Sequence, residues 1–158
     1  MANSGTVRRA VEAVLAEPPA LVLLLGNFTY YPGKRRYRDI AELIGILHPL
    51  PTAGLSVYAV LANHDYAATS LQAPKNETLA AHVRQALEAI GIRVPIDEAV
   101  ALHPPGLQHE PLIEAPPDEL LYMVGIGSDA ARLAAPARAV SQAPDSAARL
   151  VRWATLPE

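Results

Sequence analysis

The chain has 158 residues, of which 51% are hydrophobic and 18% are charged, and its formal net charge at pH 7 is -3. This composition excludes an intrinsically disordered chain, and the charge excludes a broad basic surface of the kind that binds nucleic acid. The absence of cysteine excludes disulfides, thiolate metal sites and a cysteine nucleophile. We therefore expect one globular domain over residues 1–158 with no nucleic-acid partner.

The first third of the chain alternates between amphipathic helices and short apolar runs. Residues 6–16 and 40–47 each place their apolar side chains on one helical face. Residues 20–25 and 56–61 are continuous apolar runs, which are typical of strands covered on both faces. Both runs end in polar loops, and we expect these loops at the edge of the sheet where open α/β folds bind ligands.

The rest of the chain predicts one more helix and then several strands. The helix covers residues 77–90, with Asn76 as its N-cap and Gly91 as its C-terminal stop. Five prolines within residues 103–118 predict an irregular excursion. The fold class is therefore α/β, with a sheet that begins parallel, becomes mixed and is flanked by helices. The strands predicted in this part are residues 92–96, 99–102, 120–126 and 147–151.

Nothing in the sequence indicates export or membrane insertion. Arg8 and Arg9 lie within the first amphipathic segment, which lacks the apolar core and cleavage site of a signal peptide. No apolar run approaches the roughly 20 residues that cross a bilayer. We expect a cytoplasmic protein without a membrane partner.

The ends of the first two predicted strands carry the most specific motifs. Residues 21–30 read Leu-Val-Leu-Leu-Leu-Gly-Asn-Phe-Thr-Tyr, and residues 57–66 read Val-Tyr-Ala-Val-Leu-Ala-Asn-His-Asp-Tyr. They resemble the strands that end in Gly-Asp and in Gly-Asn-His-Asp in the calcineurin-like metallophosphoesterase family. Residues 83–100 and 121–129 are similar to later segments of that family. The resemblance covers most of the chain and implies a partial metallophosphoesterase-like sandwich.

The resemblance also implies that the metal site of the family is incomplete. Family members hold two divalent metals that clamp phosphoryl oxygens and generate hydroxide. In this chain the neutral Asn27 stands where an anionic Asp bridges the metals, and Ala62 replaces the usual Gly. The domain lacks the first strand of the family, with its Asp-x-His, and the C-terminal segments with Gly-His-x-His, so that only Asn63 is carried over as a metal ligand. We expect no metal cofactor or a weakly bound divalent ion.

The polar residues after the second strand form the predicted catalytic group. The resemblance implies that His64 contacts a phosphoryl oxygen, that Asp65 fixes the tautomer of His64, and that Asn63 is a residual metal ligand. An inherited turn, in which Asn and Asp side chains bond to the local backbone, explains these residues equally well. For Asn27, we favour a strand-end amide that satisfies the neighbouring loop over a substrate contact.

Aromatic and basic residues near the two loops are candidates for substrate binding. Tyr30, Tyr31 and Tyr66 are predicted to form the wall of a substrate pocket, and packing beneath the loops is the alternative that we favour slightly. The basic cluster at residues 34–38 either attracts a phosphate-bearing substrate or is a solvated helix start.

Two functions remain open from the sequence. The first is a reduced phosphoesterase-like hydrolase that acts on a small-molecule phosphodiester or a related activated ester, with His64 as its central polar group. The second is a catalytically silent metallophosphoesterase remnant that serves self-association or protein binding. A homodimer is expected because residues 21–25 would lack the strand that pairs beside them in the family, and an uncharged open edge tends to pair with another chain.

Overall fold

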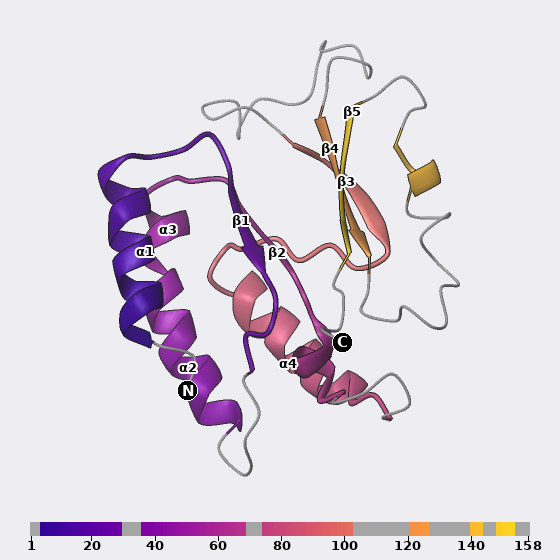
Figure 1. Ribbon diagram of the computed structural model, residues 1–158, viewed down its shortest axis with the longest axis horizontal. Helices are drawn as coiled ribbons and strands as arrows, with labels where there is room; N and C mark the ends of the chain where they lie inside the picture. Colours follow the sequence, from indigo (N-terminus) through magenta and orange to yellow (C-terminus); the bar gives the residue numbers. More distant parts are fainter. Residues whose placement is uncertain are drawn as a thin grey trace.

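The computed structural model describes residues 4–29, 36–68, 74–102, 121–126, 140–143 and 148–153. Its helices are α1 (Ser4–Ala16), α2 (Arg36–Leu47), α3 (Pro49–Thr52) and α4 (Glu77–Glu88), with one 3₁₀ helix, η1 (Asn63–Tyr66). Its strands are β1 (Val22–Leu25), β2 (Val57–Val60), β3 (Glu98–Leu102), β4 (Leu121–Ile126) and β5 (Ala148–Trp153) (Figure 1). The prediction of a mixed α/β chain is confirmed.

Strands β1 and β2 form a parallel pair. Val22 lies opposite Val57 at one end of the pair, and Leu25 lies opposite Val60 at the other. A parallel pair needs a long crossover connection, and the chain between these strands contains α2 and α3. The carboxyl ends of β1 and β2 therefore lie at the same edge, so the loops that follow them are neighbours.

The sequence predicts a single sheet that begins parallel and becomes mixed, whereas the described strands form a parallel pair and a separate mixed sheet. In the second sheet β3 is antiparallel to β4, and β4 is parallel to β5. The strand predicted over residues 92–96 is reduced to a single bridge, in which Arg93 bonds to Val57 and Ala59 of β2. Pro95 has no N–H to continue this ladder, and Asp97 takes a positive φ of 53°. The chain therefore turns away from β2 before β3 begins.

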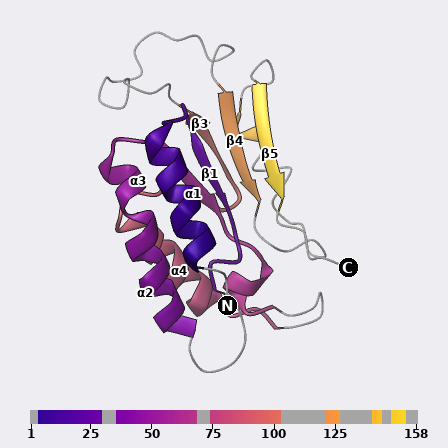
Figure 2. The ribbon, with the colours of Figure 1, turned by 60° about the vertical axis from the view of Figure 1, so that its left-hand side comes forward.

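The two faces of the β1–β2 pair are covered by different layers. Val57 and Ala59 belong to the main core together with apolar residues of α1, α2, α3 and α4. Tyr58, between them in sequence, packs on the opposite face with Leu102 and Val100 of β3. This alternation follows the two-residue period of a strand. Figures 1 and 2 show the resulting order of layers, with the helices on one side of β1 and β2 and the sheet β3–β5 on the other.

Helix α4 begins at Glu77, as the sequence predicts, and ends at Glu88, before the predicted end at residue 90. The side chain of Asn76 accepts a hydrogen bond from the N–H of Leu79, at 2.9 Å, which satisfies a free donor of the first turn. Gly91 follows the helix with a φ of 89°, a conformation that favours glycine. Across the described ranges, no helix has both the length and the apolar character needed to span a membrane.

Candidate functional site

The loops after β1 and β2 are in direct contact at Gly26. The N–H of Gly26 donates to the carbonyl of Val60 at 2.8 Å and extends the parallel ladder by one bond beyond β1. A Cβ atom on Gly26 would lie 2.4 Å from both the backbone nitrogen and the Cβ of Ala62. Only glycine allows this approach without a shift of the backbone, so close packing requires glycine at position 26.

Asp65 joins the two loops through its carboxylate. One oxygen, Oδ2, accepts hydrogen bonds from the backbone N–H groups of Asn27 and Ala62, at 2.9 and 2.8 Å. The other, Oδ1, accepts from the N–H of Thr29 at 2.9 Å and from its hydroxyl at 3.2 Å. The Asp65 residue has an exposed fraction of 0%. Four donors converge on a buried carboxylate, and three of them come from the loop after β1.

Burial and hydrogen bonding act in opposite directions on Asp65. Removal from water raises the pKa of its carboxyl group above the ordinary value, because the charged form loses its hydration. The hydrogen bonds from Ala62, Thr29 and Asn27 lower the pKa, and burial is the larger effect. Burial of the carboxylate therefore costs solvation free energy, and the hydrogen bonds from the two loops offset this cost.

Asn27 is held in the same network. It takes a positive φ of 67°, which asparagine tolerates better than most residues. Its side-chain oxygen lies 3.4 Å from the backbone nitrogen of His64 and accepts a hydrogen bond from it. Both the backbone and the side chain of Asn27 thus contact the Asn-His-Asp segment, which is the kind of contact that the structural interpretation of this amide requires.

Asn63 and His64 begin the 3₁₀ turn η1 at the end of β2. Asn63 is 4% exposed, and its side-chain nitrogen donates to the carbonyl of Ala68 at 3.0 Å. The side-chain oxygen of Asn63 is buried and accepts no hydrogen bond from the described residues. His64 is partly exposed, and its carbonyl accepts a hydrogen bond of 2.8 Å from the Thr29 hydroxyl. The loop after β1 therefore forms hydrogen bonds with both the backbone N–H and the carbonyl of His64.

Tyr66 lies in the core beside these residues. It is 4% exposed and belongs to the main hydrophobic cluster, and the Lys75 ammonium lies 5.3 Å from its ring centre. Burial is the main cause that raises the pKa of Tyr66 to about 12, and the Glu77 carboxylate adds to it. This placement matches packing beneath the loops rather than an open pocket wall. Tyr30 and Tyr31 fall outside the described residues, as do residues 34 and 35 of the basic cluster.

The described residues do not supply the ligands of a two-metal centre. Within the ranges that the structure describes, no three His, Cys, Asp or Glu side chains are grouped so that they could hold a metal ion. The oxygens of Asp65 already accept four hydrogen bonds, and the Asn27 oxygen faces the N–H of His64. The Asn63 oxygen and the His64 imidazole remain. One neutral amide and one imidazole do not hold two divalent cations, whose bridging ligands are anionic oxygens. The donors of the described residues therefore do not fit a binuclear centre.

Thr29 is the residue of this network that the sequence analysis missed. It is 1% exposed; its hydroxyl contacts both the carbonyl of His64 and the carboxylate of Asp65, and its N–H donates to Asp65. A hydroxyl two residues after Asn27 is a weak signal, because threonine is common in loops. Its partners lie 35 and 36 residues away in sequence, and only the parallel pairing of β1 and β2 brings them together.

Comparisons with models of known protein families, with curated proteins and with solved structures found no match to this chain.

Proposed function

We propose that the chain is a reduced phosphoesterase-like hydrolase, built on a partial metallophosphoesterase-like sandwich, that acts on a phosphodiester or a related activated ester. The observation that carries the proposal is the attachment of the Asn-His-Asp turn to the end of β1. Asp65, Thr29 and Asn27 hold this turn at the carboxyl ends of two parallel strands. This is the edge at which open α/β sheets bind ligands.

His64 is the residue proposed to act on the substrate. Its backbone N–H and carbonyl are bonded to Asn27 and Thr29, while the residue as a whole is partly exposed and its ring Nδ1 is buried. An imidazole in this place can donate a hydrogen bond to a phosphoryl oxygen or a proton to the leaving oxygen. Asp65 is a positioning residue in this proposal, because its carboxylate fixes the loops that hold His64. No step is assigned to a metal ion, since the described donors do not fit a binuclear centre.

Replacement of His64 by Ala tests the proposal. We expect turnover of a chromogenic phosphodiester to fall by about a hundredfold or more, the range in which a general acid contributes. His82→Ala is the matched control, because His82 is exposed on α4, outside the loops, and its removal should leave turnover unchanged. Circular dichroism of both variants checks that the fold is retained.

Two outcomes would contradict this function. Equal turnover by the wild-type protein and by His64→Ala would place the chemistry elsewhere. Elemental analysis that finds two tightly held divalent ions per chain would show that the protein builds a full metal centre. Turnover that persists in the presence of a chelator is the result we expect.

A second candidate function, self-association of a catalytically silent chain, is favoured by the open edge of β1. Among the described strands, β1 pairs with β2 alone. The strand reads Val-Leu-Leu-Leu and carries no charge or proline to oppose pairing with another chain. Its last residue, Leu25, is 51% exposed and is the one large hydrophobic side chain found exposed in the described part of the protein. A second copy of β1, related by a two-fold axis, would cover this edge.

Leu25→Lys tests the edge without disturbing the core, because Leu25 is already half exposed. Light scattering over a dilution series should show a dimer for the wild-type chain and a shift to monomer for the variant, since a lysine on an edge strand discourages pairing. Gln85→Lys, at an exposed position of α4, adds the same charge and should leave the dimer intact. A wild-type chain that stays folded and monomeric at micromolar concentration would exclude a dimer through β1.

A further inference from the structure

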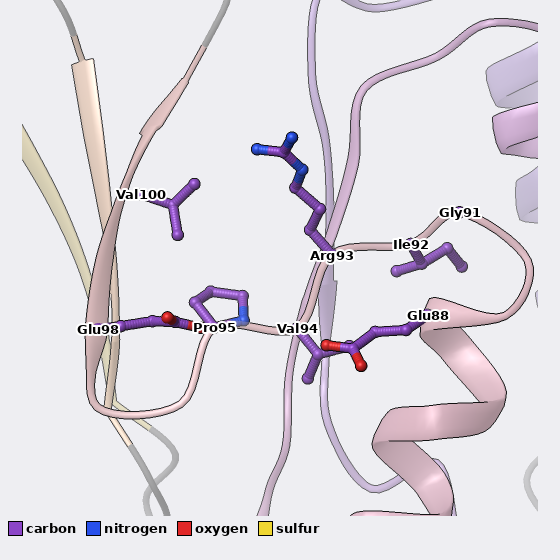
Figure 3. A pocket seen from close by; sticks show the side chains of 8 residues that line it. All are labelled: Glu88, Gly91, Ile92, Arg93, Val94, Pro95, Glu98 and Val100. Atoms are coloured by element: carbon purple, nitrogen blue, oxygen red, sulfur yellow. The ribbon is translucent and has the colours of Figure 1, made fainter.

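A hollow of about 410 Å³ lies between residues 91–95 and β3, at the junction of the two sheets. Its lining contains no residue of the loops at 26–29 and 62–66, so it is a separate feature from the site around His64. Figure 3 shows that its side chains come from the end of α4, from the segment that bridges to β2, and from β3. A volume of this size is within the range of small-molecule sites.

Arg93 lines this hollow, and among the described residues no carboxylate pairs with its guanidinium. Its backbone is fixed by two hydrogen bonds to β2, from its N–H to the carbonyl of Val57 at 3.1 Å and from the N–H of Ala59 to its carbonyl at 2.8 Å. Its side chain is exposed, and the guanidinium makes no hydrogen bond or ion pair with any residue in the described ranges. In Figure 3 the guanidinium extends along the gap beside Val100. These two hydrogen bonds fix the backbone of Arg93 and so fix the point from which its guanidinium extends into the hollow.

The two carboxylates of the hollow are already paired with a different arginine. Arg84 bonds to Glu88 at 2.7 Å and lies 3.7 Å from an oxygen of Glu98. The contact with Glu88 raises the pKa of the Arg84 guanidinium, which remains charged. The two carboxylates and the two arginines sum to a net charge of zero around the hollow. Arg93 carries the positive charge that is exposed to solvent.

The remaining lining is apolar. Ile92 is 1% exposed and lies beside Gly91 at the α4 end of the lining, while Pro95 and the partly exposed Val100 lie on the side of β3 (Figure 3). A ligand that satisfies Arg93 would therefore lay an apolar body against Val100 and Pro95. Guanidinium groups bind carboxylates through two parallel hydrogen bonds.

We propose that this hollow binds a small monocarboxylate with a short apolar chain, its carboxylate on Arg93 and its chain against Val100 and Pro95. A monoanion is favoured over a phosphate dianion, because a dianion would leave two uncompensated negative charges beside Glu88 and Glu98. The ligand class thus differs from the phosphoester proposed for the site at His64.

Titration of the ¹⁵N-labelled protein with butyrate tests this proposal. We expect saturable amide shifts confined to residues 91–100 and affinity at least tenfold weaker in Arg93→Gln. Arg8→Gln removes the same charge at an exposed position of α1 and should bind butyrate as the wild-type protein does. Val100→Ala should weaken butyrate more than acetate, because it shortens the wall that the chain contacts.

Three results would overturn the proposal. Shifts that fail to saturate, or that are equal in Arg93→Gln, would show that butyrate only screens charge. Equal binding of butanol would show that the carboxylate is not recognised. Tighter binding of butyl phosphate than of butyrate would assign the hollow to dianions. Each spectrum also reports whether the variant is folded, so loss of binding is separated from loss of structure.

Discussion

Asp65→Asn is expected to lower the free energy of unfolding by about 2–6 kcal/mol, because two donors lose their acceptor and each buried donor without an acceptor costs about 1–3 kcal/mol. The substitution keeps the size of the side chain but turns one acceptor oxygen into an NH₂ group. If the NH₂ replaces Oδ2, it faces the N–H groups of Asn27 and Ala62. If it replaces Oδ1, it faces both donors of Thr29. Urea denaturation followed by circular dichroism measures the loss.

Glu12→Gln is the control for this substitution. It makes the same chemical change at an exposed position of α1 and should alter stability by no more than about 0.5 kcal/mol. If Asp65→Asn were as stable as the control, the carboxylate would not be the joint between the two loops. For the hydrolase proposed above, turnover should fall together with the stability of Asp65→Asn, because Asp65 is bonded to both loops that hold His64.

The stability difference between the wild-type protein and Asp65→Asn should also depend on pH. Burial raises the pKa of Asp65 in the folded protein above its value in the unfolded chain. The folded state then binds the proton more tightly, and the stability from that proton is complete below the unfolded pKa of about 3.9. It is lost as the pH rises through the folded pKa. The difference should therefore be larger at acidic pH than at neutral pH, and a difference that grows towards neutral pH would mean that the hydrogen bonds outweigh burial.

Gly26→Ala is expected to have the second large effect: overpacking should lower the free energy of unfolding by about 3 kcal/mol. The added Cβ would lie 2.4 Å from the backbone nitrogen of Ala62 and 2.8 Å from the carbonyl oxygen of Val60. These are atoms of β2 and its loop, so relief requires a shift of backbone rather than a rotation of a side chain. The shift would also lengthen the hydrogen bond from Gly26 to Val60. Thermal unfolding and urea titration both measure this loss.

Gly45→Ala is a matched substitution with the opposite expected sign. Gly45 lies within α2, and no atom lies within 4 Å of the place where its Cβ would stand. Alanine in a helix interior is more stable than glycine by about 0.5–1 kcal/mol. A loss of stability in both variants would indicate a general sensitivity to added methyl groups and would contradict a specific contact at Gly26.

Local pattern was sufficient to predict most elements of the fold. The amphipathic period of residues 6–16 and 40–47 lies within α1 and α2, and the apolar runs at 20–25 and 56–61 contain β1 and β2. The cap at Asn76 and the stop at Gly91 were correct because both depend on backbone groups a few residues away. The strand at 92–96 was wrong because periodicity does not show where a ladder runs out of partners, and Pro95 ends it after one bridge.

What the sequence determined by itself about the site is its location: polar residues follow two apolar strands, and the carboxyl ends of these strands meet in a parallel pair. Only the tertiary structure decided the role of Asp65. Three of the four donors to its carboxylate belong to Asn27 and Thr29, which lie 38 and 36 residues away and are backbone or hydroxyl groups without a distinctive sequence signal. The same holds for the hollow at Arg93, whose surroundings depend on how the two sheets pack. Hydrogen bonds and packing contacts form between segments that are far apart in sequence. The sequence pattern therefore predicts which residues are polar, but it does not predict which partner each of them contacts.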